Sequence, residues 1–351
     1  MEKNNLKIGN RSIGEKSPVF IIADAGVNHN GRLSLAKRMV DAAKKSGVDA
    51  IKFQIFKAEE LATPQAPKAR YQKKKSAGES QMEMLKRLEL SEPDFRSLFS
   101  YCRKKKIIFL ATPFDFSSVD FLVRLGVPAF KISSGDLNNI PFLTRIAKYR
   151  KPVILSTGMS SLTEVKEAVK AIYSAGNKQL ILLHCTSNYP TSPADVNLRA
   201  MNTLKKEFNT MVGYSDHTAG REISIAAVVL GARLIERHFT LDKIMAGPDH
   251  RASLDVDELK RMVMEIRNVE AALGDGGKKI RRSEIEVKNA VRKSLVAQVD
   301  IPAKKTIRPW MLTLKRPGTG IEPKYFDCLI GKRLKKSVSR NQTLKWSEVD
   351  L

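Results

Sequence analysis

Two spacings of apolar positions alternate along this chain. Short runs of β-branched and other apolar residues recur between residues 18 and 274, and each is followed by a longer stretch whose apolar positions repeat every three to four residues. The short runs predict strands, and the longer stretches predict amphipathic helices. The eight predicted strands are residues 19–23, 50–54, 107–111, 129–133, 153–156, 180–185, 211–214 and 234–237.

The predicted helices carry start and stop signals. Ser161 and Glu164 form a capping-box pair, Asp255 and Glu258 repeat it, and Gly274 ends the second of these helices. Strands that alternate with helices indicate a parallel sheet covered by helices. Eight such units favour a (β/α)8 TIM barrel over residues 1–274, with a doubly wound open sheet as the alternative.

The pattern changes after Gly274. Residues 275–292 are rich in Gly, Lys and Arg and predict a linker. Residues 293–351 begin with a strand-like alternation and are then broken by four prolines, which predicts one small β-rich module. Because so few residues bury little surface, we expect this module to dock on another part of the protein.

Charge is the unusual feature of the composition, since 62 basic against 37 acidic residues give a net charge of +25. Nucleic acid is one partner that such a charge suggests. However, the basic runs are scattered among different predicted elements and carry no interleaved aromatic residues, so nucleic-acid binding is disfavoured. The charge is interpreted instead as solvated surface, with steering of anionic substrates as a by-product.

Several features predict a cytoplasmic protein. The polar start of the chain predicts no signal peptide. The longest apolar run, residues 225–230, is far shorter than the ~20 residues of a membrane span. Cys102, Cys185 and Cys328 are odd in number and lack the spacing of disulfide or metal sites, which is typical of a reducing cytosol.

Polar side chains gather at the carboxyl ends of the predicted strands, where TIM barrels carry their reactive groups. Two lysines, several hydroxyls and two neighbouring histidines in one ring predict a site for a phosphorylated anion beside a metal. The ring contains Asp24, Lys52, Gln54, Thr112, Lys131, Ser134, Ser156, Tyr189, Ser215, His217, Glu236 and His238.

The histidines predict the metal ligands. Four of the five lie in the last three strand-end loops, and His217 and His238 end adjacent strands with Asp249 nearby. Without a third obvious soft ligand, a closed structural zinc site is disfavoured. An open site completed by water or substrate oxygens suits Mn²⁺ or Mg²⁺.

The sequence resembles the N-acetylneuraminate (sialic acid) synthase family, which includes legionaminic and pseudaminic acid synthases and spore-coat polysaccharide synthases. The resemblance is carried by strings in family order, and LKRPGTGI in residues 290–350 resembles the family's antifreeze-like (SAF) domain. The strings are IIADAGVNHNG, IKFQIF, ATPFD, KISSGD, LSTGMS, HCTSNYPT, GYSDHT, IERHFTLD and GPDH.

This resemblance implies condensation of phosphoenolpyruvate with an open-chain N-acetylated amino sugar, N-acetylmannosamine or a 2,4-diacetamido relative, to a nonulosonic acid. It implies a divalent metal on His217 and His238, Mn²⁺ in preference to Mg²⁺ or Co²⁺, and a domain-swapped homodimer in which Arg316 enters the site. The residues implied to hold phosphoenolpyruvate are Lys52, Thr112, Lys131, Ser134, Ser156 and Ser215, and those implied to contact the sugar are Gln54, Tyr189 and Asp249.

Two positions depart from the family pattern. Asp24, the candidate to orient water or act as base, stands where the family usually has Glu, and Ser187 stands where sialic acid enzymes often have Asn. The alternative functions are another phosphoenolpyruvate-dependent 3-deoxy sugar acid synthase, which needs a second phosphate pocket, and a non-catalytic carbohydrate-binding protein. The complete polar ring disfavours a barrel without activity.

Overall fold

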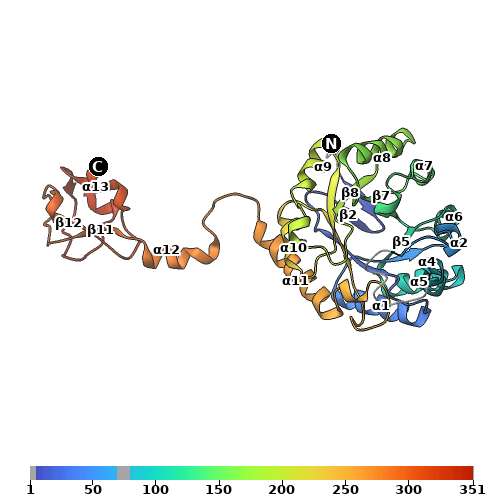
Figure 1. Ribbon diagram of the computed structural model, residues 1–351. Helices are drawn as coiled ribbons and strands as arrows, with labels where there is room; N and C mark the ends of the chain where they lie inside the picture. Colours follow the sequence, from blue (N-terminus) through green and yellow to red (C-terminus); the bar gives the residue numbers. More distant parts are fainter. Residues whose placement is uncertain (1–4, 69–79, 351) are drawn as a thin grey trace. The chain divides into compact units, whose positions relative to one another are not determined.

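A computed structural model describes residues 5–68 and 80–350 of the chain (Figure 1). The chain divides into two compact units, Met1–Gly274 and Asp275–Leu351. Within the described ranges, no helix combines the length and apolar character needed to cross a membrane.

The first unit is built around an eight-stranded parallel sheet, ordered β5-β4-β3-β10-β9-β8-β7-β6. The end strands β5 and β6 contact each other, so the sheet curves into a nearly closed barrel. This confirms the predicted TIM barrel and excludes the doubly wound alternative. The strands are β3 (Phe20–Gly26), β4 (Ala50–Ile55), β5 (Ile108–Pro113), β6 (Phe130–Ile132), β7 (Val153–Ser156), β8 (Leu180–Cys185), β9 (Met211–Asp216) and β10 (Leu234–His238).

Helices surround the barrel strands (Figure 1). The predicted capping boxes start two of them: the Ser161 side chain accepts from the Glu164 amide at α8, and Asp255 does the same for Glu258 at α11. The helices are α1 (Leu33–Ser46), α2 (Ala58–Leu61), α4 (Gln81–Leu88), α5 (Glu92–Lys105), α6 (Phe116–Leu125), α7 (Ile140–Ala147), α8 (Leu162–Ser174), α9 (Ala200–Phe208), α10 (Glu222–Val229) and α11 (Val256–Leu273).

A short hairpin closes the amino-terminal end of the barrel. Strands β1 (Leu6–Ile8) and β2 (Arg11–Ile13) pair antiparallel, and Ile8 and Ile13 are fully buried. Both pack with residues at the starts of barrel strands, such as Phe20 and Leu234. The sequence predicts no strand here, because two isolated isoleucines among polar residues show no apolar period. The hairpin therefore covers the starts of the barrel strands, at the end opposite to the one where those strands finish.

The second unit has an apolar core of its own, which includes Leu295, Ile307 and Leu344. Segment 275–292, predicted as a linker, contains a helix, and the Asn289 carbonyl of that helix accepts from the Gly318 amide at 2.7 Å. The elements of this unit are α12 (Ile285–Val291), β11 (Ser294–Ala297), β12 (Leu312–Lys315), α13 (Phe326–Leu329), β13 (Arg333–Leu334) and β14 (Val349–Asp350).

Candidate active site

One cavity of about 480 Å³ occupies the mouth of the barrel. It is lined by every barrel residue that the sequence predicted for the site, and Arg316 lies in the second unit. The period of two along each strand explains this convergence, because alternate residues face the inside of the barrel. The predicted residues around the cavity are Asp24, Lys52, Gln54, Thr112, Lys131, Ser134, Ser156, Tyr189, Ser215, His217, His238 and Asp249.

Asp24 joins a lysine and a histidine from the neighbouring strands. Its Oδ2 lies 2.9 Å from Lys52 Nζ and 3.2 Å from His238 Nε2, while Oδ1 accepts from the Gly26 amide at 2.9 Å. Burial alone would raise the pKa of Asp24, but His238 and Lys52 together hold that pKa at about 2. Asp24 is therefore ionised at neutral pH and accepts hydrogen bonds.

Glu236 connects the two lysines, a role that the sequence alone did not predict. Its Oε1 accepts from the Ser215 hydroxyl at 2.9 Å and lies 3.4 Å from Lys131 Nζ, and its Oε2 lies 3.9 Å from Lys52 Nζ. Leu234 belongs to the inner core of the barrel, so residues 236 and 238 on the same strand also point inward. This alternation was the available signal for Glu236.

The two lysines differ electrostatically. Burial lowers the pKa of Lys131, and Glu236 offsets this only in part. Burial also acts to lower the pKa of Lys52, but Asp24 and Glu236 raise it above its usual value. Lys131 donates to Ser156 Oγ at 2.8 Å, and Lys52 donates to Thr112 Oγ1 at 3.2 Å. A bound anion would stabilise the charged form of Lys131 most, because that charge is the less compensated.

The two histidines fit an open metal site. His217 Nδ1 donates to the Thr186 carbonyl at 2.8 Å, which leaves Nε2 as an acceptor, and burial with the neighbouring His238 lowers the pKa of His217 to about 4. The His238 ring lies 5.6 Å from the His217 ring, and its buried Nδ1 has no hydrogen-bond partner within the described part of the chain.

No group of three or more His, Cys, Asp or Glu side chains that could hold a metal occurs among the described residues. A cation held here would therefore have two imidazole ligands and complete its coordination with water or substrate oxygens. This donor set is that of an open site and not of a closed structural one.

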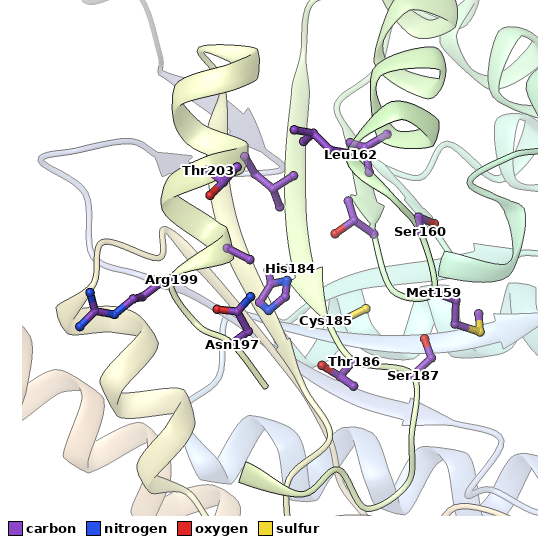
Figure 2. Close-up of a pocket in the computed structure, with 14 residues that line it drawn as sticks. Met159, Ser160, Leu162, His184, Cys185, Thr186, Ser187, Asn197, Arg199 and Thr203 are labelled. Carbon is purple, nitrogen blue, oxygen red and sulfur yellow. The ribbon is translucent and has the colours of Figure 1, made fainter. Parts of the chain in front are cut away.

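A second recess of about 650 Å³ adjoins the first on the outside of the barrel, between β8 and helices α8 and α9 (Figure 2). Met159, Cys185 and Ser187 line both spaces. Ser187, one of the two departures from the family pattern, thus stands in the wall between them. No pattern in the sequence predicts this recess.

Comparisons with known proteins agree with this geometry. The NeuB family model matches residues 39–278, and the SAF domain model matches residues 292–350. The chain is 48% identical to the N,N'-diacetyllegionaminic acid synthase of Campylobacter jejuni, over 93% of this chain and 98% of that protein. It is 47% identical to the synthase of the same name from Legionella pneumophila, over 99% of each chain. The crystal structure of the N-acetylneuraminic acid synthetase of Leptospira borgpetersenii in complex with citrate has a TM-score of 0.72 and 38% identity, over 82% of this chain and 97% of that one.

Proposed function

The chain belongs to the NeuB family and is an enzyme, and on this premise we propose that it condenses phosphoenolpyruvate with an open-chain N-acetylated amino sugar to a nonulosonic acid and phosphate. The observation that carries the proposal is the convergence of two buried lysines and two buried histidines on one cavity. Such a site joins an anion-binding half to a metal-binding half, as a phosphorylated enol and an aldehyde require.

Phosphoenolpyruvate suits the side of the cavity formed by Lys52 and Lys131. Both ammonium groups are almost fully buried, so their charges act on a bound anion with little screening by solvent. The hydroxyls around them supply further donors to phosphate and carboxylate oxygens, and they come from Thr112, Ser134, Ser156 and Ser215.

The sugar suits the part of the same cavity that Gln54, Tyr189 and Asp249 line. Both legionaminic acid synthases described above make products whose names specify two acetyl groups. A 2,4-diacetamido sugar is therefore the preferred substrate, with N-acetylmannosamine as the alternative.

A divalent cation, Mn²⁺ in preference to Mg²⁺ or Co²⁺, would be held by His217 and His238 and would supply Lewis-acid polarisation of the sugar aldehyde. The enol carbon of phosphoenolpyruvate attacks this aldehyde, and cationic character develops at C2. Asp24, with a pKa of about 2, is a weak base. Its role is to orient the water that adds at C2 and to stabilise the adjacent positive charge. The proton that this water loses is taken up by the alkoxide formed from the aldehyde.

The intermediate then carries a hydroxyl and a phosphate on C2. Its collapse to the ketone releases phosphate and the hydroxyl proton. Lys131 and Lys52 balance the negative charge of the departing group, since both ammonium groups face the cavity.

A second copy of the chain is proposed to complete the site through Arg316. The turn that carries this residue is fixed, because Ser294 Oγ donates to the Pro317 carbonyl at 2.7 Å and accepts from the Gly320 amide at 2.9 Å. The Arg316 side chain is exposed and has no hydrogen bond or ion pair with any described residue. An exposed cation on a rigid turn is suited to bind an anion outside its own module.

Phosphate release tests the proposal. The protein is incubated with phosphoenolpyruvate, Mn²⁺ and a panel of N-acetylated hexosamines and diacetamido sugars, and each product is identified by mass. Phosphate should appear only when an accepted sugar is present, and Asp24→Asn should slow release by about 10²-fold or more. Release that does not depend on any sugar would contradict the proposal.

A further inference from the structure

Asn28, in the loop between β3 and α1, has no role in the reaction as described so far. It does not line the active-site cavity, yet it is only 1% exposed. Its Nδ2 donates to the Phe239 carbonyl at 2.9 Å and to Ser253 Oγ at 3.0 Å. Both partners belong to loop 239–255, which follows β10 and contains Asp249. The side chain of Asn28 therefore joins two loops that lie far apart in the sequence.

Ser253 connects Asn28 to Asp249. The Ser253 hydroxyl accepts from Asn28 and donates to the Asp249 carbonyl at 2.7 Å. A serine hydroxyl has a single hydrogen. Because the Asn28 amide supplies the donor on one side, that hydrogen is directed to the Asp249 carbonyl on the other. The three residues thus form one directed chain of hydrogen bonds that ends at a residue of the cavity.

The contact with Phe239 ties the same amide to the end of β10. Phe239 directly follows His238, and its own amide donates to the Asp24 carbonyl at 2.9 Å. The Phe239 peptide is therefore held both by β3 and by the loop that follows β3. As a result, the two hydrogen bonds of Asn28 fix the position of Asp249 relative to His238.

A second set of contacts holds the other flank of Asp249. His250 is fully buried, with Nδ1 2.7 Å from Thr240 Oγ1 and Nε2 3.2 Å from Asn30 Oδ1. Asn30 Nδ2 donates to the Ala246 carbonyl at 2.9 Å. The loop that contains Asp249 is thus attached to the loop after β3 on both sides of this carboxylate.

Only the donor half of the Asn28 amide is used. Its Oδ1 is buried and has no hydrogen-bond partner in the part of the chain that the structure describes. A buried acceptor without a partner lowers stability. Local costs of this kind are typical of residues that serve a functional site.

We propose that Asn28 is a positioning residue for the sugar substrate, because it sets the place of Asp249 in the cavity through Ser253. The inference rests on the proposed function, in which Asp249 contacts the sugar. Asn28 itself contacts neither substrate. Loss of its amide donor therefore weakens the use of the sugar and leaves the binding of phosphoenolpyruvate unchanged.

Asn28→Asp tests the proposal, since it keeps the shape of the side chain and replaces the donor by an acceptor. The Ser253 hydroxyl can then donate to the new carboxylate and release the Asp249 carbonyl. We expect the KM for the sugar to rise about tenfold, which corresponds to the loss of one hydrogen bond. The KM for phosphoenolpyruvate should stay within about twofold of the wild-type value. Steady-state kinetics with each substrate varied in turn measure both constants.

Asn177→Asp is the matched control. Asn177 is also 1% exposed, and its Nδ2 donates to the Lys151 carbonyl at 2.8 Å. It precedes β8, at the opposite end of the barrel from the cavity. Asn177→Asp should lower the free energy of unfolding without a change in either KM.

Ser253→Ala is a second variant, which breaks the same chain of hydrogen bonds by removing one hydroxyl. It should also raise the KM for the sugar, and the double variant with Asn28→Asp should show no further rise. An unchanged KM for the sugar in folded Ser253→Ala would overturn the inference, whether or not Asn28→Asp folds. Equal rises in KM for both substrates, or the same effect on the sugar in Asn177→Asp, would also overturn it. Failure of the proposed function itself is distinguishable, because the wild type would then release no phosphate with any sugar.

Discussion

Asp24 Oδ2 and Lys52 Nζ lie 2.9 Å apart at the mouth of the barrel, and each side chain is only 3% exposed. Lys131 is similarly buried but has its nearest carboxylate at 3.4 Å. Both lysine charges are therefore positioned to act on a ligand. Unlike the charges of exposed ion pairs, they are little screened by solvent.

Replacement of either lysine by Met keeps the apolar stem and removes the charge. We expect Lys131→Met and Lys52→Met each to lower kcat/KM for phosphoenolpyruvate by an amount equivalent to about 2–4 kcal/mol. Lys166→Met is the control, since 70% of the Lys166 side chain is exposed on α8. Steady-state kinetics at saturating sugar measure the effect. If both variants kept the wild-type kcat/KM for phosphoenolpyruvate, the two lysines would not belong to the anion site.

Removal of metal should stop turnover without unfolding the protein. Chelation is expected to abolish phosphate release, and Mn²⁺ or Mg²⁺ should restore it. His217→Ala should lower the Mn²⁺ content per chain while the circular dichroism spectrum stays native, because the described residues form no closed cluster of ligands on which folding would depend. Full activity in excess chelator would contradict this assignment.

Subunit exchange tests the role of Arg316. Arg316→Ala and His217→Ala should each be inactive alone. After mixing and exchange, part of the activity should return, because one mixed site then holds both the arginine and the histidine. Arg308→Ala, at another exposed arginine of the second unit, is the control and should be active alone. Proven heterodimers without recovered activity would show that Arg316 acts within its own chain or not at all.

His29 should make stability depend on pH. It is 1% exposed, and burial is the main cause that lowers its pKa from 6.5 to about 4. The unfolded chain therefore binds more protons between these values, so the stabilisation is complete above pH 6.5 and is lost as pH falls towards 4. The titration of His29 alone should lower the free energy of unfolding by about 3 kcal/mol as pH falls over that range.

In the native protein the Gly31 amide donates to His29 Nδ1 at 3.2 Å. His29→Asn keeps a side-chain acceptor for this amide and removes the titrating imidazole. Urea unfolding from pH 7 to pH 4 should show a smaller loss of stability in this variant than in the wild type. Parallel pH profiles for the two proteins would show that His29 does not titrate as described.

The sequence predicted the barrel and the converging residues because both follow from local periodicity. Each predicted strand ends where a short run of apolar residues gives way to polar ones. Lys52, Lys131 and His238 could therefore be assigned to one ring from the sequence, without knowledge of their contacts. Glu236 lay in the same ring but received no role. Its contacts to both lysines depend on side-chain geometry across three strands. The two-residue period along one strand does not predict that geometry.

Other features depend on packing between distant segments. The hairpin β1–β2 is held by Ile8 and Ile13 against strand starts far along the chain, and no pattern within residues 6–13 indicates that burial. The recess beside the active site forms between α8 and α9, where Leu162 and Thr203 face a common space. A sequence pattern predicts each helix but not the gap that remains between them.

The fate of the bridging oxygen of phosphoenolpyruvate tests the central claim most directly. Phosphoenolpyruvate labelled with ¹⁸O at that oxygen is incubated with the protein, Mn²⁺ and the accepted sugar. The masses of both products, phosphate and the sugar-derived acid, are measured by mass spectrometry. The account predicts that the label appears in phosphate, and that an unlabelled acid forms with the summed mass of the sugar and pyruvic acid. Label retained in the acid, or phosphate formed without a sugar-derived acid, would contradict it.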